Sequence, residues 1–339
     1  MIENKILKTI RKYNLIENGD KVVLGVSGGP DSITMLNILN IIRKQNIINF
    51  DIIVAHVNHG IRENAIKDEQ YVQDFCTKIG IRCFVLKANV RKQAKEEKKG
   101  LEETGRKVRY EFFNKILKET GSNKIAIAHN ANDNVETIIM NILRGSGLGG
   151  LKGIEAENGV YIRPLIEIKR DEIERYCENE KLNPRHDESN DDNNYTRNKI
   201  RNIAIPYIKK EINPNIIDTI TRLSLIVKDD VDYLEKETFK AYNSICLEDY
   251  IENNVYNLTK TAKIILDLKK FNSLERTIQK RIILYAINRL FGSTQGIEKI
   301  HIEDMIKLCN NNIGNKYLTP NQKTKIVIKN KKIIIERLK

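Results

Sequence analysis

One short stretch of the sequence combines residue types that could bind a phosphate group. It reads SGGPDS and lies between an apolar run, Val22 to Val26, and a segment with helical spacing. Glycines that join a strand to a helix leave backbone N–H groups exposed, and the helix N-terminus adds a partial positive charge. The stretch therefore predicts an anion-binding loop, whose candidate residues are Ser27, Gly28, Gly29, Pro30, Asp31 and Ser32.

Two familiar phosphate loops do not match this stretch. A Walker A loop requires a lysine after its last glycine, and none follows Gly29; the spacing of a dinucleotide-binding fingerprint is absent too. A simple Gly-Pro turn with a serine or aspartate helix cap remains as the structural alternative.

Acidic side chains form a second group. Asp31 beside phosphates would repel them unless a cation intervenes, which favours a Mg²⁺ ligand over a helix cap. His129, Asp133 and Glu136 have spacings of four and three, which place them on one face if the helix extends back that far. Asp133 and Glu136 are therefore candidates for Mg²⁺ binding or proton acceptance. The alternative is a capping Asp133 and a solvated Glu136.

The elements that must position these residues alternate along the first half of the chain. Apolar runs predict strands, and the segments between them predict helices, so we expect an α/β fold with a doubly wound parallel five-stranded sheet. Ligands bind at the carboxyl ends of such strands. The strands are expected at Lys21–Val26, Asp51–Val57, Arg82–Leu86, Lys124–Ala128 and Val160–Leu165, and the helices at Ser32–Arg43, Asn64–Ile79, Leu101–Thr120, Asn132–Leu143 and Arg170–Lys181.

The strand signal stops after about Pro206. Ile216–Leu247 and Ser273–Phe291 have the spacing of amphipathic helices, and the basic end of the chain predicts a β-hairpin that turns at Asn330. We therefore expect a catalytic domain at 1–206, a helical domain at 207–300 and a short C-terminal segment at 301–339, composed of a helix and a β-hairpin.

The composition of the chain indicates which class of partner it binds. The net charge of +13 over 339 residues favours a polyanion such as RNA, although lysines can also merely solvate helix faces. No apolar run reaches membrane-spanning length, the N-terminus has no apolar signal core, and the five cysteines form no C-x-x-C pair. We expect a cytoplasmic protein without a disulfide framework.

Further motifs identify a family resemblance. SGGPDS resembles the loop of the PP-loop, or N-type ATP pyrophosphatase, superfamily. Six more motifs occur in the order found in the tRNA(Ile)-lysidine synthase family: AHVNHGIR, GRKVRYEFF, the stretch from Ile127 to Ile154, IRPL, HDESN and RNKIRNIAIP. The resemblance covers about residues 20 to 206 and is looser beyond them.

The resemblance implies a reaction and its cofactors. Members of this family are ligases that adenylate the wobble cytidine of tRNA(Ile) with a CAU anticodon and join L-lysine to C2, releasing AMP and diphosphate. ATP and Mg²⁺ are then the cofactors, and tRNA(Ile) and free lysine are the partners, with a homodimer also suggested. Lysine must lose a proton before it can attack, so Asp133 or Glu136 would serve as the base.

The resemblance also distributes the histidines and arginines. His56, Arg62 and His129 would contact ATP. Arg109 and Arg201 are assigned to the α-phosphate, and Arg144 and Arg197 to RNA phosphates, although each could be a solvated surface arginine. Asp31, Asp133, Glu136, Arg109 and Arg201 are then the catalytic candidates.

Two other functions remain open from the sequence. A PP-loop ligase for a small acid, as in NAD synthetase, would release diphosphate without RNA. A nucleotide- and RNA-binding protein without chemistry would not need the carboxylates, and all three are present. A zinc deaminase is excluded, because no P-C-x-x-C motif follows His186.

Overall fold

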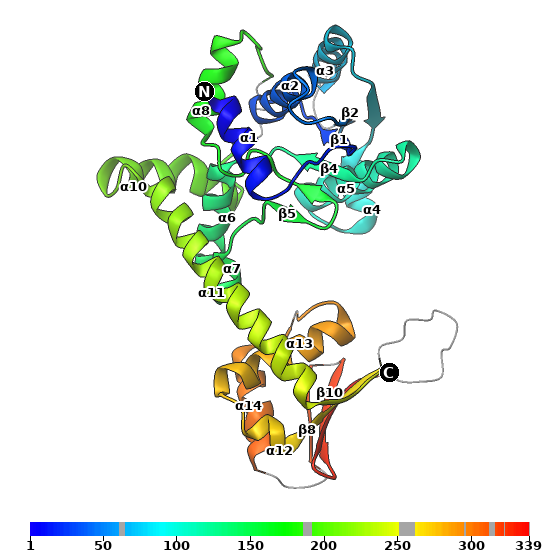
Figure 1. Cartoon of the computed structure of the whole chain (residues 1–339), viewed down its shortest axis with the longest axis vertical. Helices are drawn as coiled ribbons and strands as arrows, with labels where there is room; N and C mark the ends of the chain where they lie inside the picture. Colours follow the sequence, from blue (N-terminus) through cyan, green and yellow to red (C-terminus); the bar gives the residue numbers. More distant parts are fainter. Residues whose placement is uncertain are drawn as a thin grey trace. The chain divides into compact units, whose positions relative to one another are not determined.

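The chain divides into two compact units, Met1–Val227 and Lys228–Lys339. A computed structural model describes residues 1–60, 65–185, 192–250, 262–294, 296–311, 316–321 and 323–338 (Figure 1). Each unit has its own hydrophobic core. The phosphate loop and the candidate carboxylates lie in the first unit.

A parallel sheet forms the centre of the first unit, as the sequence predicts. Its strands are apolar on both faces because helices cover both, which explains the near-continuous valine and isoleucine runs. A short antiparallel strand, β5, adds a sixth member at one edge. The sheet order is β3 (Cys83–Lys87), β2 (Asp51–Asn58), β1 (Lys21–Gly25), β4 (Lys124–Ile127), β6 (Tyr161–Ile162), β5 (Glu157–Asn158).

Helices pack on both faces of this sheet and make two separate cores. Val22 and Leu24 of β1 point into one core, and Val23 points into the other, as strand geometry requires. The fold is therefore doubly wound, as expected. The first face carries α1 (Ile2–Lys12), α2 (Pro30–Lys44), α3 (Ala65–Ile79) and α8 (Arg170–Asn179), and the second carries α4 (Val90–Glu97) and α5 (Leu101–Thr120).

A third group of helices follows β4 and positions two arginines. Ala131 and Val135 of α6 (Ala131–Leu143) pack against Ile200, Ile205 and Ile217. Ile200 begins a single π-helical turn, Ile200–Ala204, in an otherwise α-helical segment. The flanking helices are α7 (Leu148–Leu151), α9 (Thr196–Lys199), α10 (Ile205–Glu211) and α11 (Ile216–Ile245).

The second unit contains more β-structure than the sequence predicts. The expected hairpin is present and turns at Asn330 and Lys331, which both have positive φ. It forms the interior of a five-stranded antiparallel sheet and is not a free tail. The strand order is β7 (Cys246–Tyr250), β8 (Lys263–Asp267), β11 (Lys332–Arg337), β10 (Thr324–Lys329), β9 (Tyr317–Asn321).

The segment expected as a helical domain also contributes two strands to this sheet. Strands β7 and β8 lie inside 207–300, between the two helices that were predicted there. The first compact unit extends to Val227, beyond the expected boundary at residue 206, because α10 and the start of α11 pack with it. The helices of the second unit are α12 (Leu268–Asn272), α13 (Arg276–Phe291) and α14 (Lys299–Asn310).

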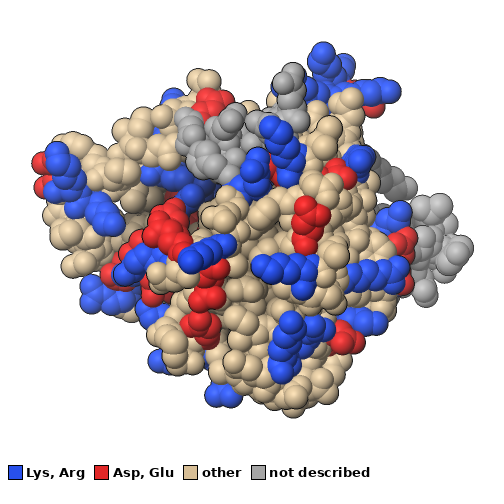
Figure 2. Space-filling view, turned by 90° about the horizontal axis from the view of Figure 1, so that it is seen from above, with Lys and Arg blue, Asp and Glu red and all other residues tan. Residues whose placement is uncertain are grey.

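Charged side chains are spread over the surface. Figure 2 shows lysines and arginines across the visible face, with aspartates and glutamates among them. Within the described residues, no helix combines the length and the apolar character that crossing a membrane requires.

Candidate functional site

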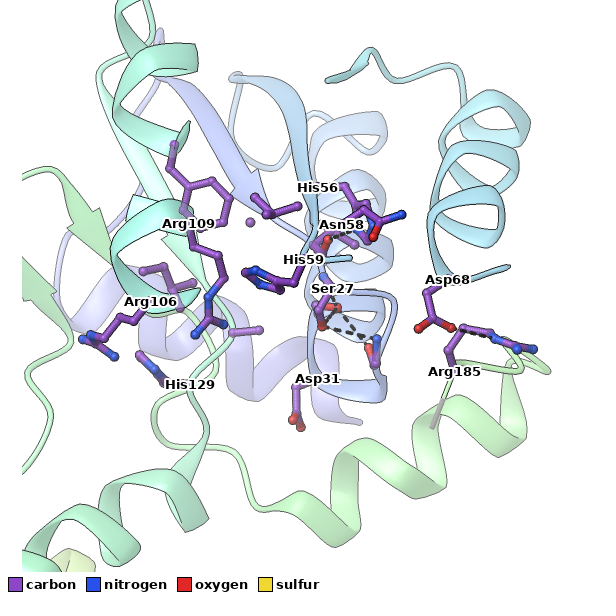
Figure 3. Close-up of a pocket in the computed structure, with 18 of the residues that line it drawn as sticks. Ser27, Asp31, His56, Asn58, His59, Asp68, Arg106, Arg109, His129 and Arg185 are labelled. Atoms are coloured by element: carbon purple, nitrogen blue, oxygen red, sulfur yellow. Dashed lines mark hydrogen bonds and ion pairs between the residues drawn. The ribbon is translucent and has the colours of Figure 1, made fainter. Parts of the chain in front are cut away.

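A cavity of about 610 Å³ opens at the carboxyl ends of the parallel strands. It is lined by the loop after β1, the end of β2, helix α5 and the segment after β4. Figure 3 shows Arg106, Arg109 and His129 on one side of this cavity and Ser27, Asp68 and Arg185 on the other. Ligands of doubly wound sheets bind at this position.

The SGGPDS loop forms one wall of the cavity and has the geometry of an anion site. Gly28 has φ of 95°, a conformation that favours glycine. The buried Ser32 Oγ accepts hydrogen bonds from the backbone N–H groups of Ser27 at 3.1 Å and Gly28 at 3.2 Å, which fixes the loop. No side chain caps the N-terminus of α2 at Gly29. The capping alternative for Asp31 therefore finds no support, and the helix end is available to an anion.

Asp31 projects from the first turn of α2 toward the segment after β4. Its carboxylate accepts a hydrogen bond from Asn130 Nδ2 at 2.9 Å. Burial, with the nearby Asp133 carboxylate, raises the pKa of Asp31 to about 6. A cation at this carboxylate would offset both effects, since each of them disfavours the ionised form.

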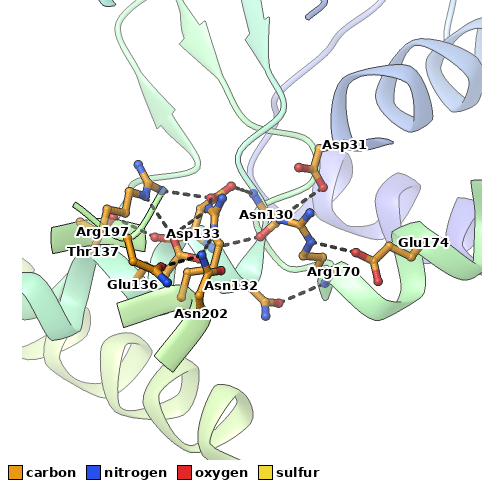
Figure 4. Close-up of polar contacts among 12 residues, drawn as sticks. Asp31, Asn130, Asn132, Asp133, Glu136, Thr137, Arg170, Glu174, Arg197 and Asn202 are labelled. Carbon is orange, nitrogen blue, oxygen red and sulfur yellow. Dashed lines mark hydrogen bonds and ion pairs between the residues drawn. The ribbon is translucent and has the colours of Figure 1, made fainter. Parts of the chain in front are cut away.

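Asp133 and Glu136 are both buried on α6 and both contact arginines (Figure 4). Asp133 also completes a capping box with Asn130: each side chain accepts a hydrogen bond at 3.0 Å from the other residue's backbone N–H. The N-cap of α6 is therefore Asn130, with Asp133 as its partner in the first turn, and Glu136 is only 1% exposed and not solvated.

Arg197 and Arg201 converge on this carboxylate pair. Arg197 donates to Glu136 at 2.9 Å and to Asp133 at 3.0 Å. Arg201 donates to Glu136 at 2.6 and 2.8 Å and to Asp133 at 2.8 Å. Burial would lower the pKa of Arg201, but the Glu136 carboxylate outweighs it and the pKa is raised. Both arginines therefore bind the same carboxylate pair in the structure, and the assignment of Arg201 to ATP and Arg197 to RNA stays a prediction.

The expected Mg²⁺ site is only partly assembled. Asp31, Asp133 and Glu136 all belong to the described residues, in which no group of three or more His, Cys, Asp or Glu side chains is placed to hold a metal ion. Asp31 alone of the three lines the cavity.

Two histidines in the cavity wall are held in opposite tautomers. His56 Nδ1 lies 2.8 Å from the backbone carbonyl of Val26, so Nδ1 must carry the proton. His56 Nε2 is then an acceptor, and it is buried without a partner. His129 Nδ1, in contrast, accepts a hydrogen bond from Arg163 Nε at 3.2 Å. Burial lowers the pKa of both histidines, that of His129 to about 4.

The structure places most of the expected site residues at this cavity. Ser27, Gly29, Pro30, Asp31, Ser32, His56, Arg109 and His129 line it. Asp133, Glu136, Arg197 and Arg201 form the adjoining network described above. Arg144 caps the exposed C-terminus of α6 and does not line the cavity, and Arg62 lies outside the described residues.

Several polar residues of the site were missed. Asn58, Arg106, Arg170 and Arg185 line the cavity, and Arg163 supports His129. Arg163 is inside the IRPL motif and Arg185 directly precedes HDESN. An arginine within a buried-strand pattern, such as Arg163 in IRPL, indicates a site residue, because a buried arginine requires a specific partner.

Comparisons with known proteins show which family the chain belongs to. The model of the PP-loop domain family matches residues 1–208. The tRNA(Ile)-lysidine synthase of Clostridioides difficile strain 630 is 42% identical, covering 100% of this chain and 72% of that protein. The tRNA(Ile)-lysidine synthase of Clostridium acetobutylicum is 44% identical, covering 94% of this chain and 66% of that protein. The chain therefore spans roughly two thirds to three quarters of these relatives' length.

One solved structure supports the same fold. The U34-tRNA thiolase NcsA from Methanococcus maripaludis, solved with its 4Fe–4S cluster, matches with a TM-score of 0.51 and 25% identity. The match covers 66% of this chain and 78% of that one.

Proposed function

The chain belongs to the tRNA(Ile)-lysidine synthase family of PP-loop enzymes, and we propose that it catalyses the ATP-dependent ligation of L-lysine to C2 of the wobble cytidine of tRNA(Ile) with a CAU anticodon. The cytidine 2-oxygen attacks the α-phosphorus of ATP, and diphosphate leaves. The lysine ε-amine then attacks C2, AMP leaves with the oxygen, and the amine loses a proton. The modified base pairs with A, so decoding changes from AUG to AUA.

One observation carries this proposal: the uncapped phosphate loop lines a cavity at the carboxyl ends of the strands, and Asn130 links its Asp31 to Asp133 of the adjoining arginine–carboxylate network. The uncapped N-terminus of α2, which ends the loop, offers backbone N–H groups to the β- and γ-phosphates of ATP. The buried, unpartnered Nε2 of His56 offers an acceptor to an adenine amino group or a ribose hydroxyl. An unsatisfied buried acceptor is costly, so its presence in a cavity wall supports a bound donor.

Mg²⁺ fits the site through Asp31. When bound, it would neutralise phosphate charge. Asp31 is the one carboxylate of the predicted set in the cavity wall, and Mg²⁺ commonly takes one or two carboxylates with substrate phosphates and waters. We propose that Asp31 holds the ion beside the loop.

Asp133 and Glu136 are proposed to receive the lysine ammonium and then its proton. Their oxygens are engaged by Arg197 and Arg201 in the described structure. An ammonium that binds there must displace at least one guanidinium contact. A displaced guanidinium would then be free to stabilise negative charge on the transferring phosphoryl group.

The opposite wall of the cavity suits RNA. Within the described part of the chain, Arg106 and Arg109 form no ion pair with a carboxylate, and both side chains are exposed. Cytosine C2 is accessible only in an unstacked base, so the wobble nucleotide must be splayed into the cavity. We propose that Arg109 contacts the α-phosphate that is transferred to this nucleotide, and that the protein acts in the cytoplasm on free tRNA.

The test is an incorporation assay with purified protein. Radiolabelled lysine, ATP and Mg²⁺ are incubated with a tRNA(Ile) transcript that carries a CAU anticodon. A matched transcript carries uridine at the wobble position. We expect label only in the cytidine transcript, with AMP and diphosphate released in equal amounts.

Two results would overturn the proposal. Diphosphate release without lysine incorporation would assign the site to another acceptor, such as a small acid or a thiolated base. RNA binding without ATP cleavage would leave a binding protein, and the roles given to Asp31, Asp133 and Glu136 would be withdrawn.

A further inference from the structure

Arg163 occupies an unusual position for an arginine, because it is 8% exposed and has no carboxylate among its hydrogen-bond partners in the described residues. It follows the short strand β6, beside the end of β4. Its Nε donates to His129 Nδ1 at 3.2 Å, and its Nη1 donates to the backbone carbonyl of Glu155 at 2.6 Å. The guanidinium is thus held from two sides.

This contact decides which nitrogen of His129 carries a proton. A guanidinium has five donors and no acceptor, so the nitrogen that faces it must present a lone pair. His129 Nδ1 is therefore unprotonated, and in the neutral ring the proton lies on Nε2. If Nδ1 carried a proton, the N–H of His129 and the Nε–H of Arg163 would face each other in a buried contact with no acceptor between them.

The charges around His129 keep the ring neutral. They come from every element that packs against it: Asp133 on α6, Arg163 after β6, Arg197 on α9 and Arg106 on α5. Burial and the three guanidiniums lower the pKa of His129, and Asp133 opposes them. The imidazole is thus a neutral donor through Nε2.

The donor atom faces the site. His129 lines the cavity, and Nδ1 is engaged by Arg163 behind it, so Nε2 is the nitrogen directed to the cavity. His56, which also lines the cavity, is the opposite tautomer: its proton is on Nδ1, and its Nε2 is an acceptor. The two histidines therefore cannot exchange roles, although neither carries a charge.

We propose that Arg163 is a positioning residue that holds His129 as its Nε2–H tautomer, so that His129 donates a hydrogen bond to the α-phosphoryl group of ATP during adenylation. The inference rests on the proposed function for its substrate. His129 follows β4, which pairs with β1, and both His129 and the phosphate loop line the cavity, so a triphosphate held on the loop would have its α-phosphate on the His129 side. The role needs no proton transfer, since the hydrogen stays on Nε2 throughout.

Substitution of His129 tests the donor. A glutamine side chain places its amide N–H near the position of Nε2, whereas an asparagine places it near Nδ1. We expect His129→Asn to lose about 10²–10³-fold in kcat, the usual cost of one such donor, and His129→Gln to lose distinctly less. The KM for ATP should change little in both. Equal loss in the two variants would indicate a base or a cation, and the proposal would fall.

Substitution of Arg163 tests the positioning role, with ¹⁵N NMR of histidine-labelled protein as the readout. The chain has five histidines, and the His129 signals are assigned as those lost in His129→Gln. In the wild type we expect a protonated Nε2 and an unprotonated Nδ1. In Arg163→Met, which removes the donor, we expect a mixture of tautomers and a fall in kcat. Arg163→Lys keeps a donor and should restore the Nε2–H tautomer and part of kcat.

A purely structural role for Arg163 gives a different result. If Arg163 only anchors the Glu155 carbonyl, Arg163→Met lowers Tm and kcat while His129 keeps the wild-type tautomer, and the proposal is overturned. The NMR measurement requires no substrate. A wild-type protein with the expected tautomer but without lysidine synthesis would therefore reject the proposed function while leaving the Arg163 contact in place.

Discussion

At the scale of single residues, Asp31 combines a stability cost with a proposed function. Its pKa is raised from 3.8 to about 6, chiefly by burial and then by Asp133. Below pH 3.8, Asp31 is protonated in both the folded and the unfolded chain, and its burial does not lower the free energy of unfolding. Above about pH 6 both are ionised and the folded state carries the whole cost, so this contribution falls with rising pH between the two values.

Asp31→Asn should therefore stabilise the free protein at neutral pH. Without Mg²⁺ and ATP, we expect the free energy of unfolding to rise by about 2 kcal/mol at about pH 8 and by little below about pH 4. Urea unfolding at the two pH values measures this. The same variant should lose the rise in Tm that MgATP gives to the wild type, because the ion has lost its carboxylate. If Asp31→Asn were less stable than the wild type at about pH 8, the ionised Asp31 would not be an uncompensated buried charge.

His56 allows the two ring nitrogens to be separated experimentally. In His56→Asn the side-chain amide can still donate to the Val26 carbonyl, but the acceptor at Nε2 is lost. We expect Tm to stay close to the wild type and the KM for ATP to rise about tenfold, the value of one hydrogen bond to a bound ligand. His301→Asn, on α14 of the second unit, is the matched control and should leave the KM unchanged. An unaltered KM in His56→Asn would remove His56 from the ATP site.

The sequence predicted those site residues whose surroundings are local. The SGGPDS loop is one continuous stretch, so its glycines, serines and Asp31 could be assigned together. The partners of Arg197 and Arg201 depend on how α9 and the π-helical turn pack on α6, which no local pattern encodes. Arg163 stands in the IRPL motif, but its partner His129 comes from a segment that follows another strand, so the motif did not show which group this arginine contacts.

At the scale of elements, the π-helical turn brings two arginines to one buried carboxylate pair. Arg197 on α9 and Arg201 in the turn are four residues apart, and both reach Glu136 because Ile200 anchors the segment on α6. Such turns often occur at functional sites, where they alter the direction of side chains. The turn is therefore part of the site and not an irregularity.

Removal of the buried charge on this pair should be costly. Glu136→Gln leaves Arg197 and Arg201 with Asp133 as their only carboxylate among the contacts above, and we expect a loss of about 3 kcal/mol in the free energy of unfolding. Urea denaturation measures it. The double variant Glu136→Gln with Arg201→Gln should recover part of this loss, because the two residues interact directly. Arg144→Gln, at the exposed end of α6, should change stability by less than about 0.5 kcal/mol. Additive effects of Glu136 and Arg201 would contradict the network.

Element type was harder to predict in the second unit. The segment KIILD of β8 has only three consecutive buried apolar residues and follows a helix and a polar stretch. A run of that length does not distinguish a strand from a helix turn. Its identity comes from pairing with β11, more than sixty positions later, which supplies the partner for every one of its residues.

At the scale of the whole molecule, the excess of positive charge acts on RNA more than on ATP. The net charge is +13, and basic side chains are spread across the face of the molecule that Figure 2 shows. Contacts between such side chains and RNA phosphates release counterions, so affinity falls with salt. In the proposed function, ATP binding depends on the loop and on one Mg²⁺ held by Asp31, so it should respond less to salt.

We therefore expect the Kd for a labelled tRNA(Ile) transcript to rise by at least about tenfold between about 50 and about 200 mM KCl, while the KM for MgATP changes by less than about twofold. Fluorescence anisotropy measures the first quantity and diphosphate release the second. Phosphate contacts carry no sequence information, so the cytidine and uridine transcripts should show the same salt slope and differ only in turnover. A steeper slope for the cytidine transcript would mean that the wobble base sets how many phosphates are contacted, and specificity would then arise during binding and not at the adenylation step.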